Sequence, residues 1–103
     1  PDDIVGKYEA AIAEMDTEKG VIFLNDLFGG SPYNAACRLA ISNENYGIVT
    51  GVNLPMLIET IGLQLTAGDM GIKEIIEKAV AAGQGGVQTF HASEIEVDEE
   101  DDL

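Results

Sequence analysis

Apolar residues recur at helical spacing in four stretches of the chain, separated by polar or glycine-rich segments. A first helix is predicted to begin at Asp2 or Asp3, either of which can cap it, and its apolar residues continue to position 15. A second begins where Ser31, as the N-cap, precedes Pro32 at the first helical position. Two more are predicted within residues 53–65 and 72–82.

Three short segments between or after these helices have the character of β-strands. Residues 21–24 form an unbroken apolar run, typical of a strand buried on both faces of a parallel sheet. Residues 46–50 are predicted to form a second short strand. Residues 87–90 alternate apolar and polar side chains, as an edge strand or an exchanged strand would. This order of elements predicts an α/β fold: an open, mainly parallel sheet with helices on both faces.

In open α/β sheets, ligands bind beyond the carboxyl ends of the strands. Two loops of this sequence lie at such ends, Asn25–Ser31 and Gly51–Asn53. Because Asp26 follows directly after an apolar run, its carboxylate is expected to project into the crevice at this edge. The two loops are therefore the candidate functional site.

The first loop has the chemistry to handle a phosphoryl group. Gly29 and Gly30 lack a Cβ, so they tolerate positive φ and let the backbone approach a ligand closely. Free N–H groups at the helix that begins at Ser31 attract anions. A carboxylate repels phosphate, so Asp26 is better suited to accept a hydrogen bond from an imidazole, which fixes the tautomer of that ring.

Each of these residues also has a purely structural interpretation. Ser31 can be only an N-cap, Asp26 can cap a turn, and Asn53 can shape its own turn. The paired glycines are common in loops and match neither the dinucleotide-binding pattern nor the P-loop pattern. His91, the single histidine, follows the last predicted strand and is not expected to be catalytic.

Charge and composition narrow the classes of function. The formal net charge of the 103 residues is −14, which argues against binding to nucleic acid or to an anionic membrane surface. No apolar run reaches the ~20 residues of a membrane helix, and no His/Cys cluster has metal-ligand spacing. One cysteine and no secretory leader predict a cytoplasmic protein. We expect one domain, residues 1–93, followed by an acidic tail or linker, residues 94–103.

Two motifs resemble one known family. Residues 21–36, VIFLNDLFGGSPYNAA, resemble the central motif of the IIA component of mannose-type sugar phosphotransferase systems. Residues 51–56, GVNLPM, are similar to the second signature of that family, at fitting spacing. The similarity covers nearly the whole chain apart from the acidic tail, and two separate motifs in order are a specific signal.

The resemblance implies a phosphotransferase that carries a phosphoryl group on a histidine and needs no cofactor. IIA components of this family accept the group from the histidine-containing phosphocarrier protein and pass it to a IIB component, which phosphorylates the sugar during uptake. They are cytoplasmic homodimers that exchange their C-terminal strand, for which residues 87–91 are the candidate.

The resemblance also implies roles for individual residues. Asp26 matches the carboxylate that hydrogen-bonds the active imidazole, and Ser31, with the backbone around Gly30, matches the donor to the phosphoryl oxygens. Asn53, on the neighbouring loop that lines the same crevice, is expected to be a phosphoryl-binding residue together with Gly30 and Ser31.

The phosphorylated histidine of the family has no counterpart in this sequence. It follows the first strand of the family, whereas this chain begins at what corresponds to the second helix, a difference of about 40 residues. We therefore expect the chain to be part of a longer polypeptide, or to pair with a separate piece, and to be inactive alone.

The sequence leaves three other functions open. A binding or assembly module of the same fold would lack the nucleophile, and a histidine in the upstream coding sequence would exclude it. Phosphorylation of Asp26 itself would need clustered acids to hold Mg²⁺, and residues 25–27 supply only one. Nucleotide binding is the weakest alternative, because the chain has no P-loop lysine.

Overall fold

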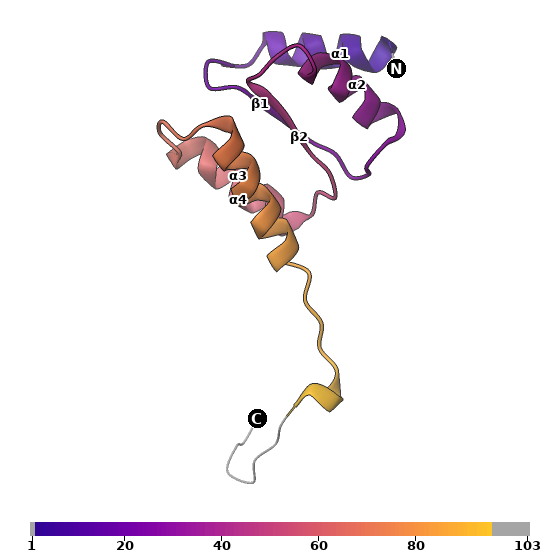
Figure 1. Cartoon of the computed structure of the whole chain (residues 1–103), viewed down its shortest axis with the longest axis vertical. Coiled ribbons are helices and arrows are strands. Elements are labelled where there is room, and N and C mark those ends of the chain that lie inside the picture. The colour runs from indigo at the N-terminus through magenta and orange to yellow at the C-terminus, as the bar shows by residue number, and fades with distance from the viewer. Residues whose placement is uncertain (1, 96–103) are drawn as a thin grey trace.

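The computed structural model describes residues 2–95, which form four α-helices and a pair of β-strands (Figure 1). The elements in chain order are α1 (Asp2–Ala13), β1 (Val21–Leu24), α2 (Gly30–Ala40), β2 (Tyr46–Val49), α3 (Leu54–Thr66) and α4 (Ile72–Gly85), followed by the short 3-10 helix η1 (Ala92–Glu94). The strands are parallel, with Val21 opposite Tyr46 and Leu24 opposite Val49. The α/β class and the parallel sheet predicted from the sequence are confirmed.

Helices α3 and α4 cover one face of the sheet. Ile22 and Leu24 of β1 pack there against a core formed by Val49 of β2, Met56 of α3 and Ala79 of α4. These apolar side chains come from elements that are far apart in the sequence. Their burial therefore fixes the position of both strand ends and of the loops that follow them.

Helices α1 and α2 lie on the other face (Figure 1). Because side chains alternate along a strand, Phe23 points to this side, where its ring centroid lies 5.3 Å from that of Tyr8 in α1. The Tyr8 hydroxyl donates to the carbonyl of Pro32 in α2 over 3.2 Å, and an exposed ion pair joins Arg38 to Asp2 at 2.6 Å. The sheet therefore has helices on both faces, as predicted.

The predicted strand over residues 87–90 does not form in the single chain. This segment leaves the end of α4 without regular secondary structure (Figure 1). The side chains of Val87 and Phe90 are 76% and 74% exposed. A strand requires a partner for its backbone groups, and within residues 2–95 the sheet contains only β1 and β2. Exchange of this segment between two chains stays a prediction.

The run of five acids that begins at Asp98 lies outside the described residues. The predicted boundary after residue 93 falls inside η1, so the structure does not test the proposed tail or linker. Within residues 2–95, no helix is both long enough and apolar enough to cross a bilayer.

Candidate functional site

The two loops predicted to form the site are joined by backbone hydrogen bonds. The amide of Gly51 donates to the carbonyl of Asp26 over 3.1 Å, and the amide of Val52 donates to the carbonyl of Asn25 over 3.1 Å. Pairing thus continues past the ends of the two strands. The structure brings the loop that contains Asp26 and the loop that contains Asn53 to the same edge of the sheet.

Asp26 lies at this edge with an exposed side chain. Its Oδ1 accepts a hydrogen bond from the amide of the next residue, Leu27, over 2.8 Å. A carboxylate has two oxygens and several lone pairs, so this local contact leaves capacity for a further donor. Asp26 thus lies at the predicted edge with a carboxylate oxygen available, and its role as the acceptor for an imidazole stays a prediction.

The N-terminus of α2 differs in detail from the sequence prediction. The N-cap is Gly29, not Ser31, and no side chain caps the helix. Gly29 and Gly30 have φ angles of 86° and 83°, which start the helix one residue before Ser31. The predicted capping role of Ser31 is therefore wrong, because two glycines in the left-handed region make the turn in its place.

This helix start is open on its outer side. A Cβ added at Gly29 or at Gly30 would meet no other heavy atom within 4 Å. The N–H groups of Gly30 and Ser31 belong to the first turn, which has no partner inside the helix. Ser31 is exposed, and within residues 2–95 its hydroxyl forms no hydrogen bond. Backbone N–H groups and a free hydroxyl together can receive an anion.

Asn53 is the residue that does cap a helix. Its Oδ1 accepts from the amide of Met56 over 3.1 Å at the start of α3, and its Nδ2 donates to the carbonyl of Gly83 in α4 over 3.0 Å. Both ends of the amide are thus engaged within the chain. Asn53 lies on the predicted loop, and its side chain joins α3 to α4.

Sequence reasoning missed two features of the loop that follows β1. Asn25 is only 7% exposed, and its Oδ1 is buried with no hydrogen-bond partner. Phe28 is 80% exposed, and its ring lies 4.9 Å from that of Tyr33 in α2. A side-chain hydrogen bond with Cys37 raises the pKa of Tyr33 above its ordinary value. The sequence did contain a signal for Asn25, because this polar residue directly continues the apolar run 21–24 and can therefore be buried with it.

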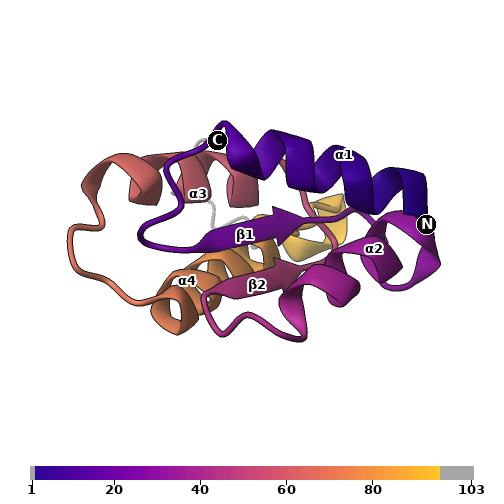
Figure 2. The same cartoon turned by 90° about the horizontal axis from the view of Figure 1, so that it is seen from above.

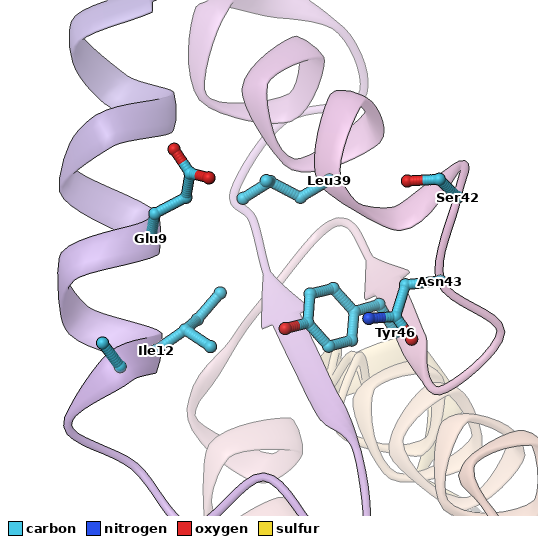
Figure 3. A pocket seen from close by; sticks show the side chains of 7 residues that line it. Glu9, Ile12, Leu39, Ser42, Asn43 and Tyr46 are labelled. Atoms are coloured by element: carbon cyan, nitrogen blue, oxygen red, sulfur yellow. The ribbon is translucent and has the colours of Figure 1, made fainter.

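A wide, open hollow of about 390 Å³ lies at the other end of the sheet (Figure 3). Glu9 and Ile12 of α1, Leu39 of α2 and Tyr46 at the start of β2 line it. Because the strands are parallel, this amino end lies opposite the two site loops. None of the predicted site residues contributes to the hollow, so it is separate from the candidate site.

The fold and this edge define an open α/β protein with an exposed acidic residue and an uncapped helix start at the carboxyl end of its sheet, which is where ligands bind in such folds. Comparison with known proteins identifies the family. A family described as the PTS system fructose IIA component matches residues 1–80. The chain therefore belongs to the IIA components of mannose-type sugar phosphotransferase systems, as the two sequence motifs predicted.

Individual relatives agree with this assignment. The mannose-specific EIIAB component of Escherichia coli strain K12 is 43% identical over 93 residues, which cover 90% of this chain and 28% of that protein. The fructose-specific EIIA component of Bacillus subtilis strain 168 is 34% identical over 82 residues, which cover 80% of this chain and 54% of that protein. The chain thus spans about half or less of these curated relatives.

The fold is also similar to that of a solved protein. The crystal structure of a phosphotransferase system component EIIA from Streptococcus agalactiae aligns with a TM-score of 0.69 and 21% sequence identity. The alignment covers 85% of this chain and 65% of that one. The comparison supports the arrangement of strands and helices described above.

Proposed function

We propose that this domain is a cytoplasmic phosphoryl carrier of a mannose-type sugar phosphotransferase system. It receives the phosphoryl group from the histidine-containing phosphocarrier protein and passes it to a IIB component. The observation that carries the proposal is the exposed carboxylate of Asp26 at the sheet edge, on the same loop as the open start of α2. Membership of the IIA family supports the class of reaction.

The imidazole that accepts the group belongs to a histidine outside the present sequence. His91 is the single histidine of the chain, and its Nδ1 accepts a hydrogen bond from the amide of Ser93 over 3.1 Å. The ring thereby caps η1, which lies beyond α4 and away from the sheet (Figure 1). His91 has a structural role, so we place the nucleophile on a further segment of the polypeptide.

The transfer step places distinct demands on the residues of this chain. The lone pair of one ring nitrogen attacks phosphorus, while the phosphorus–nitrogen bond to the carrier breaks and the leaving nitrogen keeps its electron pair. The accepting ring becomes positively charged, and its other N–H donates to Asp26, whose negative charge stabilises it. The hydroxyl of Ser31 and the N–H groups at Gly30 and Ser31 donate to the phosphoryl oxygens.

Asn53 supports this site indirectly. Its amide is engaged with Met56 and Gly83, so its contribution is to hold the loop after β2 against α3 and α4. The hydrogen bond from the Gly51 amide to the Asp26 carbonyl then holds the first loop in place against the second. We therefore assign Asn53 to positioning and the contacts with the phosphoryl group to Ser31 and the backbone at Gly30.

Substitution of Asp26 tests the proposal. In the complete polypeptide, Asp26→Asn should slow phosphoryl transfer by about 10- to 100-fold, because the neutral amide does not stabilise a cationic ring. Rapid-quench measurement of transfer from the phosphorylated carrier gives the rate, and thermal unfolding should be unchanged. Asp69→Asn, which removes an exposed acid from another loop, is the matched control. Equal rates for the two variants would contradict the assignment of Asp26.

We also propose that the domain forms a homodimer in which the segment that starts at Val87 adds to the partner. The support is the exposure of Val87 and Phe90 together with an exposed apolar stripe along α3. The stripe consists of Leu54, Leu57, Ile58, Ile61 and Leu65. Contiguous apolar surface of this kind on a small domain marks an interaction site.

A further inference from the structure

One edge of β1 has no neighbour within the described residues. The amides of Val21 and Asn25 donate to carbonyls on the side of β2. Because backbone groups alternate along a strand of a parallel sheet, the N–H and C=O groups of Ile22 and Leu24 point to the opposite side. Within residues 2–95 the sheet ends there, so this edge is able to accept a further strand.

Helix α1 lies along the open edge. Figure 2 shows it on the side of β1 that faces away from β2. Although α1 carries Ile4, Val5 and Ile12, none of its residues is fully buried. The Tyr8 hydroxyl joins the helix to α2, and within residues 2–95 no strand pairs with the edge of β1 that α1 flanks. Apolar helix surface and unpaired strand edge therefore meet at one place.

Asn25 lies at the carboxyl end of this edge. Its side chain is on the same face of the sheet as Phe23, the face that α1 and α2 cover. Buried polar atoms in folded proteins nearly always have a hydrogen-bond partner, and the Oδ1 of Asn25 has none. An acceptor that is buried but unpaired indicates a donor that residues 2–95 do not supply.

We propose that Asn25 is a positioning residue of the phosphoryl-transfer site, whose Oδ1 accepts a hydrogen bond from the strand that carries the phosphorylated histidine. This inference rests on the proposed function, which places that histidine on a further segment of the same polypeptide. The segment pairs with the free edge of β1 beside α1. The relatives support such a segment, since this chain covers only 54% of the fructose-specific relative.

The position of Asn25 explains why this hydrogen bond matters for transfer. Asp26, the acceptor for the imidazole, is the next residue, and its carbonyl is held by Gly51. A strand can slip along its neighbour, and each slip of one residue turns every side chain to the other face. A hydrogen bond to Asn25 fixes the register of the added strand, so that the imidazole meets the carboxylate of Asp26.

The test uses the complete polypeptide and steady-state transfer from the phosphorylated carrier. Asn25→Leu keeps the approximate shape of the side chain and removes the acceptor. Asn25→Thr retains an oxygen acceptor and suits a strand. We expect Asn25→Leu to lower the maximal rate at least tenfold with KM changed less than twofold, and Asn25→Thr to recover most of the rate. Asn45→Leu, an exposed asparagine at the amino end of the sheet, is the matched control.

The outcomes separate this inference from the proposed function. If the unaltered protein accepts a phosphoryl group and Asn25→Leu transfers it at the same rate, Asn25 has no positioning role, and a water or another group meets its oxygen. A fall in rate that Asn25→Thr does not recover, or that Asn45→Leu shares, also overturns the role. If the unaltered protein accepts no phosphoryl group, the proposed function fails, and the role of Asn25 fails with it.

Discussion

The beginning of α2 shows how two adjacent glycines decide the chemistry of a neighbouring side chain. Gly29 and Gly30 adopt positive φ, so the helix starts at Gly30 and its N-cap has no side chain. A serine at position 31 then lies within the first turn, where its hydroxyl is not needed for capping. Ser31 is exposed, so its hydroxyl is accessible from outside the chain.

A prediction about Ser31 follows from this geometry. Loss of a capping serine costs about 1 kcal/mol, but loss of an exposed side chain in the first turn is expected to change the free energy of unfolding by less than about 0.5 kcal/mol. We expect Ser31→Ala to leave stability in urea unchanged and to weaken phosphoryl transfer in the complete polypeptide. A loss of stability without a loss of transfer would show that the serine is structural after all.

The sequence predicted the position of the capping residues only in part. Ser31-Pro32 and Asn53-Leu54-Pro55 both have the composition of a helix start, and Asn53 does cap α3. Ser31 does not cap α2, because the conformation of Gly29 is a backbone property that composition leaves open. Asp26 was placed correctly at the sheet edge, because the apolar run that predicts the strand also fixes where it ends, two residues before Asp26.

At the scale of elements, β2 and α4 pack closely at Gly47. A Cβ added at Gly47 would overlap the side chain of Ile76 in α4. The glycine therefore lets the helix approach the strand, and this approach buries Ala79 completely. Since α4 covers both strands from this face, the contact also fixes the sheet edge at which the site loops begin.

Gly47→Ala tests this packing. We expect it to lower the free energy of unfolding by about 1–3 kcal/mol, because Ile76 or the helix must shift. Gly6→Ala in α1 is a suitable control, since a Cβ there has open space and alanine should favour the exposed helix by about 0.5–1 kcal/mol. Urea unfolding of both variants measures the difference. Equal stabilities would mean that α4 does not pack closely on Gly47.

The two strands of the sheet were predicted correctly, whereas the strand predicted at residues 87–90 is absent from the single chain. The segments predicted at 21–24 and 46–50 form β1 (Val21–Leu24) and β2 (Tyr46–Val49), whose two faces are covered by helices. The alternating segment at 87–90 forms no strand in the single chain, because alternation specifies a half-buried side-chain pattern and not the partner that must supply the hydrogen bonds. The free edge of β1 also lacks a partner strand among residues 2–95.

At the scale of the whole molecule, the domain carries more exposed apolar surface than a folded monomer needs. The stripe along α3 and the two exposed residues Val87 and Phe90 lie on elements that follow the site in sequence. Burial of this apolar surface against a second copy would favour association and offset the electrostatic repulsion between two chains of high negative charge. The proposed dimer, formed through the segment that starts at Val87, would cover both exposed regions.

Sedimentation equilibrium tests the dimer. We expect Phe90→Glu to shift the protein towards the monomer, because a charge replaces an apolar contact in the exchanged segment. Ser42→Glu adds the same charge at an exposed position at the end of α2 and should leave the assembly unchanged. An identical molecular mass for both variants and the unaltered protein would contradict the proposed exchange.

The central claim is that this IIA domain relays a phosphoryl group through a histidine that lies outside the present sequence. The most direct measurement is the intact mass of the complete polypeptide before and after incubation with phosphoenolpyruvate and the general phosphotransferase components, followed by localisation of the added group. We predict the gain of one acid-labile phosphoryl group on a histidine upstream of α1. No gain would indicate a binding or assembly module, and a gain on Asp26 or His91 would equally contradict the account.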